Sequence, residues 1–249
     1  DIINWLISFS KSFLFFIIKY IIAIFGLGTI ASIIIKIVRR NNVDVIFGGE
    51  LSSGKTTIFK RLENPEITES ELLSITSTKS TKKQRGTRIA VGKRDIYPLM
   101  LDNPGQQYAD IFDGINKRFL CNPHRILIYA IALFPENKSD EDIHKNDQYR
   151  IGQIHKAIQL LSIVLKSKTV KSLDKIVVFV NKMDLLYENE VAFSKVNRNN
   201  EGINLLKKIN GFEELNEIIA YSPKVEIIYG SALKGWGIYK IRDIIKGVI

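Results

Sequence analysis

The chain has 249 residues, enough for one globular domain of ordinary size plus an appendage. Hydrophobic residues make up 45% and charged residues 25%, which excludes a disordered or collagen-like chain. The single cysteine, Cys121, excludes an intramolecular disulfide, and the three histidines show no zinc or haem spacing. The formal net charge of +10 favours acidic partners such as phosphate-bearing ligands, anionic lipid surfaces or nucleic acid.

The first forty residues are mostly Ile, Leu and Phe, unlike the rest of the chain. No residue from 20 to 35 is charged, and as a helix this stretch would cover about 24 Å of the ~30 Å hydrocarbon core. Lys19 and Lys36 lie where a long side chain can reach the interface. We therefore expect residues 1–40 to be a membrane anchor and residues 41–249 to be a separate domain.

Three other interpretations of the anchor segment are a secretory signal peptide, a buried core helix and an amphipathic helix on the membrane. No small-residue cleavage site follows the apolar stretch, and a core helix needs no apolar residues on every face. The length of the apolar segment predicts a single span. Lys36, Arg39 and Arg40 flank its downstream end, so positive-inside reasoning predicts that the following domain faces the cytosol. A hairpin of two apolar halves is the alternative to one span.

A short buried strand is predicted at 43–48, and a motif that carries chemistry follows it directly. Gly49-Glu50-Leu51-Ser52-Ser53-Gly54-Lys55-Thr56 fits the pattern G-x-x-x-x-G-K-[ST] in full, and a helical run at 57–62 comes next. In such a loop, glycines let the backbone wrap around phosphate, and the helix N-terminus adds positive potential. The predicted nucleotide-contacting residues are Gly49, Leu51, Ser52, Ser53, Gly54, Lys55, Thr56 and Thr57, with the Thr56 hydroxyl on Mg²⁺.

Two further strands are predicted at 88–92 and 96–101, paired around a Lys93-Arg94-Asp95 turn. The second strand runs into Asp102-Asn103-Pro104-Gly105. An aspartate at the end of such a strand holds Mg²⁺ through water, and the Gly105 amide meets a γ-phosphate. This segment therefore predicts the metal side of a nucleotide site.

Apolar strands at 125–131, 175–180 and 225–230 complete the predicted sheet. The second ends in Asn181-Lys182-Met183-Asp184, and a carboxylate such as that of Asp184 accepts from guanine N1–H and the exocyclic amine together. Adenine does not offer that pair of donors. The third strand leads to Ser231-Ala232-Leu233, a turn whose backbone can contact the guanine carbonyl.

In this order, these elements resemble the Ras-like GTPases of the translation-factor-related P-loop class, over residues 43–249. The resemblance implies an α/β three-layer sandwich, with a six-stranded, mostly parallel sheet that binds Mg²⁺ and GTP or GDP at the carboxyl ends of its strands. Combined with the transmembrane helix, the architecture is similar to that of the beta subunit of the signal recognition particle receptor.

The resemblance also assigns roles near the γ-phosphate. It makes Gln106 the water-orienting residue, with Lys55 and Gly105 beside it. It places a switch threonine on Mg²⁺ with Thr56 and Asp102; Thr87 is the first choice and Thr81 the second. Leu51 stands where family members commonly carry glycine, close to the attacking water, so slow hydrolysis without an activating partner is expected.

Every charged residue from 79 to 94 is basic, and this run adjoins the predicted switch. It is either a surface for anionic lipid or an acidic effector, or a solvated hairpin face. Nucleic acid is a poorer partner because no aromatic residues are interleaved. Polar insertions are predicted at 134–147 and 187–201. Two functions remain open: a membrane-anchored GTPase switch, favoured by Gln106, and a GTP-dependent docking subunit, favoured by Leu51.

Overall fold

The computed structural model of the protein describes residues 41–49, 52–76, 88–100, 122–132, 173–198 and 222–248, with the single positions 26, 29, 152, 155, 156, 159 and 220. The chain divides into two compact units, Asp1–Arg40 and Asn41–Ile249. In the first unit only Gly26 and Thr29 are described, both helical, so the predicted anchor lies outside the described residues. Within the described ranges, no helix is both long enough and apolar enough to cross a membrane.

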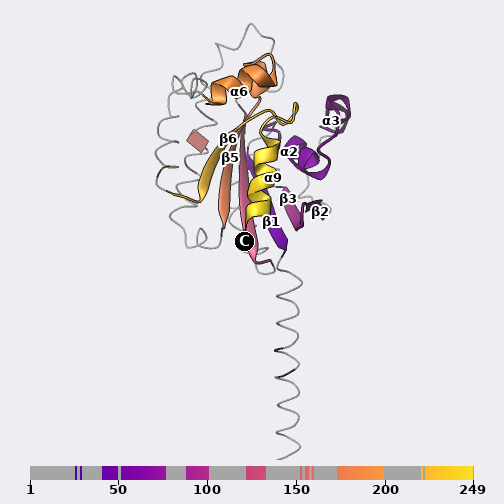
Figure 1. The fold of residues 1–249 in the computed structure, drawn as a ribbon, viewed down its shortest axis with the longest axis vertical. Helices are drawn as coiled ribbons and strands as arrows, with labels where there is room; N and C mark the ends of the chain where they lie inside the picture. The colour runs from indigo at the N-terminus through magenta and orange to yellow at the C-terminus, as the bar shows by residue number, and fades with distance from the viewer. Residues whose placement is uncertain are drawn as a thin grey trace, which may run out of the picture. The chain divides into compact units, whose positions relative to one another are not determined.

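The second unit contains a six-stranded sheet (Figure 1). In chain order its strands are β1 (Asn42–Gly49), β2 (Ile89–Val91), β3 (Arg94–Met100), β4 (His124–Ala132), β5 (Lys175–Asn181) and β6 (Val225–Tyr229). Across the sheet the order is β2-β3-β1-β4-β5-β6. The edge strand β2 is antiparallel to β3, and every other neighbouring pair is parallel. The predicted six-stranded, mostly parallel sheet is confirmed.

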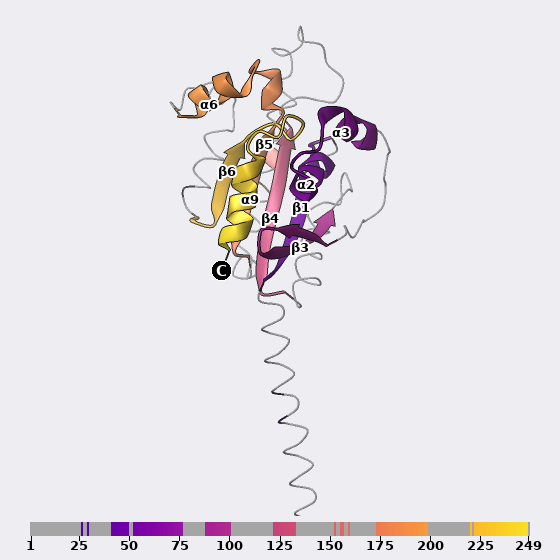
Figure 2. The same cartoon turned by 45° about the vertical axis from the view of Figure 1, so that its right-hand side comes forward.

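The described helices are α2 (Lys55–Glu63), α3 (Glu69–Thr76), the 3-10 turn η3 (Met183–Leu185), α6 (Glu190–Arg198) and α9 (Ile238–Gly247). Helices α2 and α9 cover one face of the sheet (Figures 1 and 2). The third layer of the predicted sandwich lies outside the described residues. The strand order, the antiparallel edge and the loop between β1 and α2 agree with the fold that the sequence resemblance implies.

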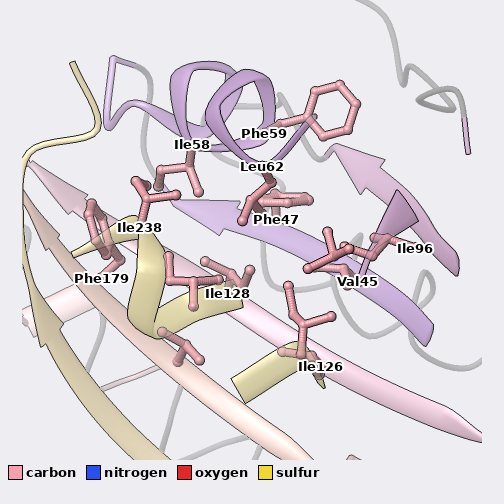
Figure 3. Packing of buried hydrophobic residues seen from close by; sticks show 14 of the residues in the cluster. Val45, Phe47, Ile58, Phe59, Leu62, Ile96, Ile126, Ile128, Phe179 and Ile238 are labelled. Carbon is pink, nitrogen blue, oxygen red and sulfur yellow. The ribbon is translucent and has the colours of Figure 1, made fainter. Parts of the chain in front are cut away.

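The core beneath α2 and α9 follows from the period of each element. Alternate residues of β1, Val45 and Phe47, point toward the helices and belong to one buried cluster with Ile58 and Leu62 of α2 and Ile238 of α9 (Figure 3). The two α2 residues are four apart and so share one helical face. All five are at most 4% exposed, which anchors the loop between β1 and α2 at both ends.

The hairpin between β2 and β3 differs from its prediction. Its turn consists of Gly92 and Lys93, whereas Arg94 and Asp95 belong to β3 and pair with β2. Gly92 has φ +63°, a conformation that permits a two-residue turn and that other residues rarely adopt. The run of three charged residues favoured a longer turn, and the sequence pattern gave no signal for a two-residue turn at Gly92 and Lys93.

Two basic side chains of the 79–94 run contact the second unit itself. Arg88 forms an ion pair with Asp95 at 2.7 Å, and Arg94 Nη2 donates to the carbonyl oxygen of Val248 at 2.5 Å. These two side chains therefore contribute to the hairpin surface. A contact of the run with lipid or an effector stays a prediction.

The insertion predicted at 187–201 contains helix α6, and the one predicted at 134–147 lies outside the described residues. Asn189 caps α6, since its Oδ1 accepts from the Ala192 amide at 2.9 Å. Phe193 is 6% exposed and gives the helix an apolar contact with the domain. The polar composition of residues 187–201 therefore did not reveal that this segment contains a helix packed against the domain.

Candidate nucleotide-binding site

The loop after β1 is shaped by backbone conformations that favour glycine. Gly49 has φ +136° and Gly54 has φ +90°, where Gly54 is the N-cap of α2. A Cβ on Gly49 would lie 2.3 Å from the carbonyl oxygen of its strand partner Ala130 on β4, so only glycine fits at this end of β1. Ser52 also has a positive φ, of 60°, which the sequence motif does not reveal.

Lys55, the first residue of α2, extends its side chain back to this loop. Its side chain is buried, with 5% of the residue exposed, and its Nζ donates to the carbonyl oxygen of Gly49 at 2.9 Å. Thr56 and Thr57, in the first turn of α2, are partly exposed. The first hydrogen bond of the helix runs from Ile58 N to Gly54 O at 2.9 Å, so the earlier N–H groups have no acceptor within the helix. An ammonium group and a helix N-terminus thus lie together at the start of α2, an arrangement that favours binding of an anion.

Ser53 is completely buried under the loop, so its side chain cannot reach a nucleotide. Any phosphate contact at this position has to use the backbone. The carbonyl oxygen of Ser53 accepts a hydrogen bond from Asn181 Nδ2 at 2.8 Å.

Asn181, the last residue of β5, joins the two halves of the candidate site. Besides its bond to the loop, its Oδ1 accepts from the backbone N–H of Ala232 at 2.8 Å. Both bonds are buried. Asn181 therefore holds the phosphate loop and the turn after β6 at a set separation, a role that its predicted place in a nucleotide motif does not reveal.

The residues after Asn181 turn sharply away from the sheet. Lys182 has φ +68°, and the Met183 amide donates to the carbonyl oxygen of Gly230 at 3.1 Å. Asp184 then lies in the short 3-10 turn η3, half-buried, at the carboxyl edge of the sheet. The backbone just before Asp184 is thus bonded to Gly230, the residue that precedes the turn that Asn181 holds.

The turn from Ser231 to Trp236, called here the base-side turn, closes on itself. The Ser231 amide donates to the carbonyl oxygen of Trp236 at 3.1 Å, and the Lys234 amide donates to Ser231 Oγ at 3.1 Å. A Cβ on Gly230 would lie 2.1 Å from the Trp236 carbonyl oxygen, so only glycine fits beside the turn. Ser231 and Ala232 are buried, and Leu233 is half-buried.

An aromatic stack supports this turn and was not anticipated from the sequence. The Phe193 ring of α6 stacks on Trp236 with centroids 5.3 Å apart, and the Tyr187 ring packs on Phe193 at 5.9 Å. Burial raises the pKa of Tyr187 above its ordinary value, which keeps its hydroxyl neutral. The available signal was two aromatic residues spaced six apart in a polar segment, which is too weak to identify a partner in another turn.

Several predicted residues fall outside the described part of the chain: Leu51, Thr81, Thr87, Asp102, Gly105 and Gln106. Among the described residues, no group of three His, Cys, Asp or Glu side chains gathers as a metal site. The structure thus brings together the phosphate loop, Asn181, Asp184 and the base-side turn. The roles predicted for the metal ligands and for Gln106 stay predictions.

No family model and no curated protein matches this chain. Among solved structures, a mutation variant of SsGBP is 20% identical with a TM-score of 0.42, covering 83% of this chain. This chain spans only 55% of that protein. The G domain of the T. maritima FeoB iron transporter is 14% identical with a TM-score of 0.39, over 82% of this chain and 97% of that domain.

Proposed function

We propose that this protein is a membrane-anchored GTP-binding protein that hydrolyses GTP to GDP and phosphate and acts as a molecular switch. The observation that carries the proposal is the double hydrogen bond of Asn181, which joins an anion-binding loop to a turn beside Asp184. A ligand that contacts both the loop and the turn needs phosphate groups at one end and a base at the other. A guanine nucleotide has both.

Recognition of guanine rests on Asp184 in this proposal. A carboxylate accepts from N1–H and from the exocyclic amine of guanine, and adenine has no matching pair of donors. Asp184→Asn should weaken GTP binding strongly and improve binding of xanthosine triphosphate, whose exocyclic oxygen suits an amide donor. Titration of the purified full chain with both nucleotides tests this. Unchanged GTP affinity would refute the assignment of Asp184.

In this proposal, three groups of the chain act near the γ-phosphate. Lys55 neutralises phosphate charge, the Gly105 amide donates to the γ-phosphate, and Gln106 orients the attacking water. Thr56, Asp102 and Thr87, or Thr81 in place of Thr87, supply the hard oxygen ligands that Mg²⁺ prefers. When bound, Mg²⁺ supplies charge neutralisation at the phosphates.

The second candidate function is a docking subunit that holds GTP with little hydrolysis, and Leu51 supports it. Single-turnover hydrolysis distinguishes the two. In a switch, Gln106→Leu lowers kcat by an order of magnitude or more with little change in GTP affinity, because it removes a transition-state interaction. In a docking subunit, Gln106→Leu changes little and Leu51→Gly speeds turnover.

Membrane attachment through residues 1–40 is supported by hydropathy, and the basic flank 36–40 supports a cytosolic GTPase domain. In cells, the full chain should stay with membranes after carbonate extraction, and protease added from the cytosolic side should remove the domain. Release by carbonate would refute the anchor. We propose an effector or activating protein at the switch segments as partner, since an arginine supplied in trans accelerates related switches by about 10³ to 10⁵.

A further inference from the structure

Arg61 is a buried cation in the second turn of α2 that the proposed GTP chemistry does not use. It is 8% exposed and lies three residues after Ile58, on the helical face that packs inward. No carboxylate among the described residues pairs with it. Its guanidinium donates instead to four backbone carbonyl groups: those of Ala232 (Nε, 3.3 Å), Leu233 (Nη2, 2.5 Å), Pro65 (Nη1, 3.4 Å) and Ile67 (Nη1).

Two of those carbonyl groups belong to consecutive peptide units of the base-side turn. The carbonyl of Ala232 shares its peptide plane with the N–H of Leu233, and the carbonyl of Leu233 shares its plane with the N–H of Lys234. In a trans peptide the C=O and N–H point in opposite directions, and the described chain has no cis peptide. Arg61 therefore fixes the direction in which both N–H groups point, away from its own side of the turn.

Of the amides of Ala232, Leu233 and Lys234, two already donate to described residues and one is left for a ligand. The Ala232 N–H donates to Asn181 Oδ1 at 2.8 Å, and the Lys234 N–H donates to Ser231 Oγ at 3.1 Å. The Leu233 N–H makes no hydrogen bond to any of the described residues. It is the donor whose direction Arg61 fixes through the Ala232 carbonyl.

We propose that Arg61 is a positioning residue for base recognition, which holds the Leu233 amide as the hydrogen-bond donor to the carbonyl oxygen of guanine. This proposal rests on the proposed function and deepens it. It separates two elements of guanine selectivity: Asp184 reads the N1–H and the exocyclic amine, whereas the amide positioned by Arg61 reads the oxygen at C6. Lysine cannot replace arginine here, because one ammonium group cannot reach carbonyls arranged around a planar fork.

The test uses two analogues that each change one edge of the base. In 6-thioguanosine triphosphate, sulfur, a weaker acceptor, replaces the C6 oxygen, whereas inosine triphosphate lacks only the exocyclic amine. Dissociation constants for GTP and both analogues are measured on the full chain in detergent. The variants are Arg61→Met, Arg61→Lys and a matched control, Arg242→Met. Arg242, on α9, donates its Nη1 to the carbonyl oxygen of Leu62 at 2.8 Å and contacts the same helix α2 away from the turn.

The wild-type chain should bind GTP about ten times more tightly than the thio analogue, as expected for one well-aligned hydrogen bond. Both Arg61 variants should reduce that preference to within about two-fold while keeping the preference for GTP over inosine triphosphate. Arg242→Met should keep both preferences. Thermal unfolding of each variant measures loss of stability separately, and Arg61→Lys carries the test if Arg61→Met does not fold.

A wild-type preference for oxygen over sulfur that persists in folded Arg61 variants would overturn the proposal, since Arg61 would then only stabilise the fold. Equal binding of GTP and the thio analogue by the wild-type chain would overturn it as well. Failure of the proposed function has a different result, namely no GTP binding by the wild-type chain. The two failures are therefore distinguishable.

Discussion

The phosphate loop and the base-side turn lie at the two ends of the candidate site, but they are stabilised in opposite ways. The phosphate loop is shaped by its own residues, through positive φ angles at Gly49 and Gly54 and a bond from Lys55 back to Gly49. The base-side turn depends on side chains far away in the chain, because Asn181 and Arg61 hold its peptide groups. A short motif can therefore encode most of the shape of the first region, although Asn181 also bonds to its Ser53 carbonyl, whereas the second region relies more on contacts that form only in the folded domain.

This contrast predicts that mutations in the phosphate loop act directly on phosphate binding, whereas mutations of the distant supports act on base selectivity and on stability. Four substitutions test it, ordered from the largest expected effect to the smallest.

Lys55→Ala should have the largest effect. It removes a charge-assisted contact to the phosphates, so nucleotide affinity should fall by about 100-fold. The measurement is the nucleotide that co-purifies with the full chain, followed by titration with a fluorescent GTP analogue. Lys60→Ala is the matched control, since Lys60 lies on the same helix but pairs with Glu63 at 2.7 Å. Undiminished nucleotide in Lys55→Ala would show that this loop is not the site.

Gly54→Ala should damage both regions, because Gly54 is where the loop touches Asn181. The new Cβ would lie 2.1 Å from Asn181 Nδ2, in a backbone conformation that costs about 1–3 kcal/mol for residues other than glycine. We expect a loss of stability of at least this size in urea unfolding, together with weaker GTP binding.

Gly247→Ala is the control for Gly54→Ala. At the end of α9 a Cβ would meet nothing within 4 Å, so stability should change by less than about 1 kcal/mol. If the two variants unfolded at the same urea concentration, the close approach at Gly54 would have no energetic consequence, and the coupling of the two regions would be refuted.

Asn181→Ala should weaken GTP binding by about ten-fold or more, because it leaves the Ser53 carbonyl and the Ala232 amide without their partner. The control is Asn122→Ala. Asn122 Nδ2 also makes a buried bond, to Asp44 Oδ1 at 2.7 Å, but near the amino ends of β1 and β4. Both variants should lose stability in thermal unfolding, and only Asn181→Ala should lose GTP affinity. Equal affinities would contradict the scaffold role of Asn181.

The smallest effect is expected at Glu71, at the start of α3. Hydrogen bonds from the backbone and the side chain of Thr68 lower the pKa of Glu71 below 4.5. Because the folded pKa is depressed, the contribution of Glu71 to stability is present above pH 4.5 and disappears as pH falls through the folded pKa.

Glu71→Gln should thus lower Tm slightly at pH 7 and not at all once Glu71 is protonated in the folded wild type. Glu69 of helix α3 pairs with Lys234 of the base-side turn at 2.8 Å, and both side chains of this ion pair are exposed. GTP affinity should therefore stay unchanged in Glu71→Gln. A clear loss would mean that α3 supports the turn more strongly than this exposed ion pair suggests.

Much of the fold was predictable because its signals are local. The apolar runs that became β1, β4, β5 and β6 are short, nearly continuous and buried in a parallel sheet, which is the pattern expected for such strands. The glycine-rich loop was recognisable because phosphate binding demands particular residues at particular spacings. The turn at Gly92 and helix α6 were wrong or missed, since a two-residue turn and a capped helix can both occur in polar sequence.

From the sequence alone, the chain was expected to have a phosphate loop between a strand and a helix, a carboxylate after a later strand and a turn after the last. Tertiary structure decided how these come together: Asn181 between loop and turn, Arg61 under the turn, and Phe193 stacked on Trp236. The physical reason is range. Backbone conformation and hydrophobic period act over a few residues. The bonds from Asn181 to Ser53 and from Arg61 to Ala232 join positions 128 and 171 residues apart, through a sheet register that no local pattern specifies.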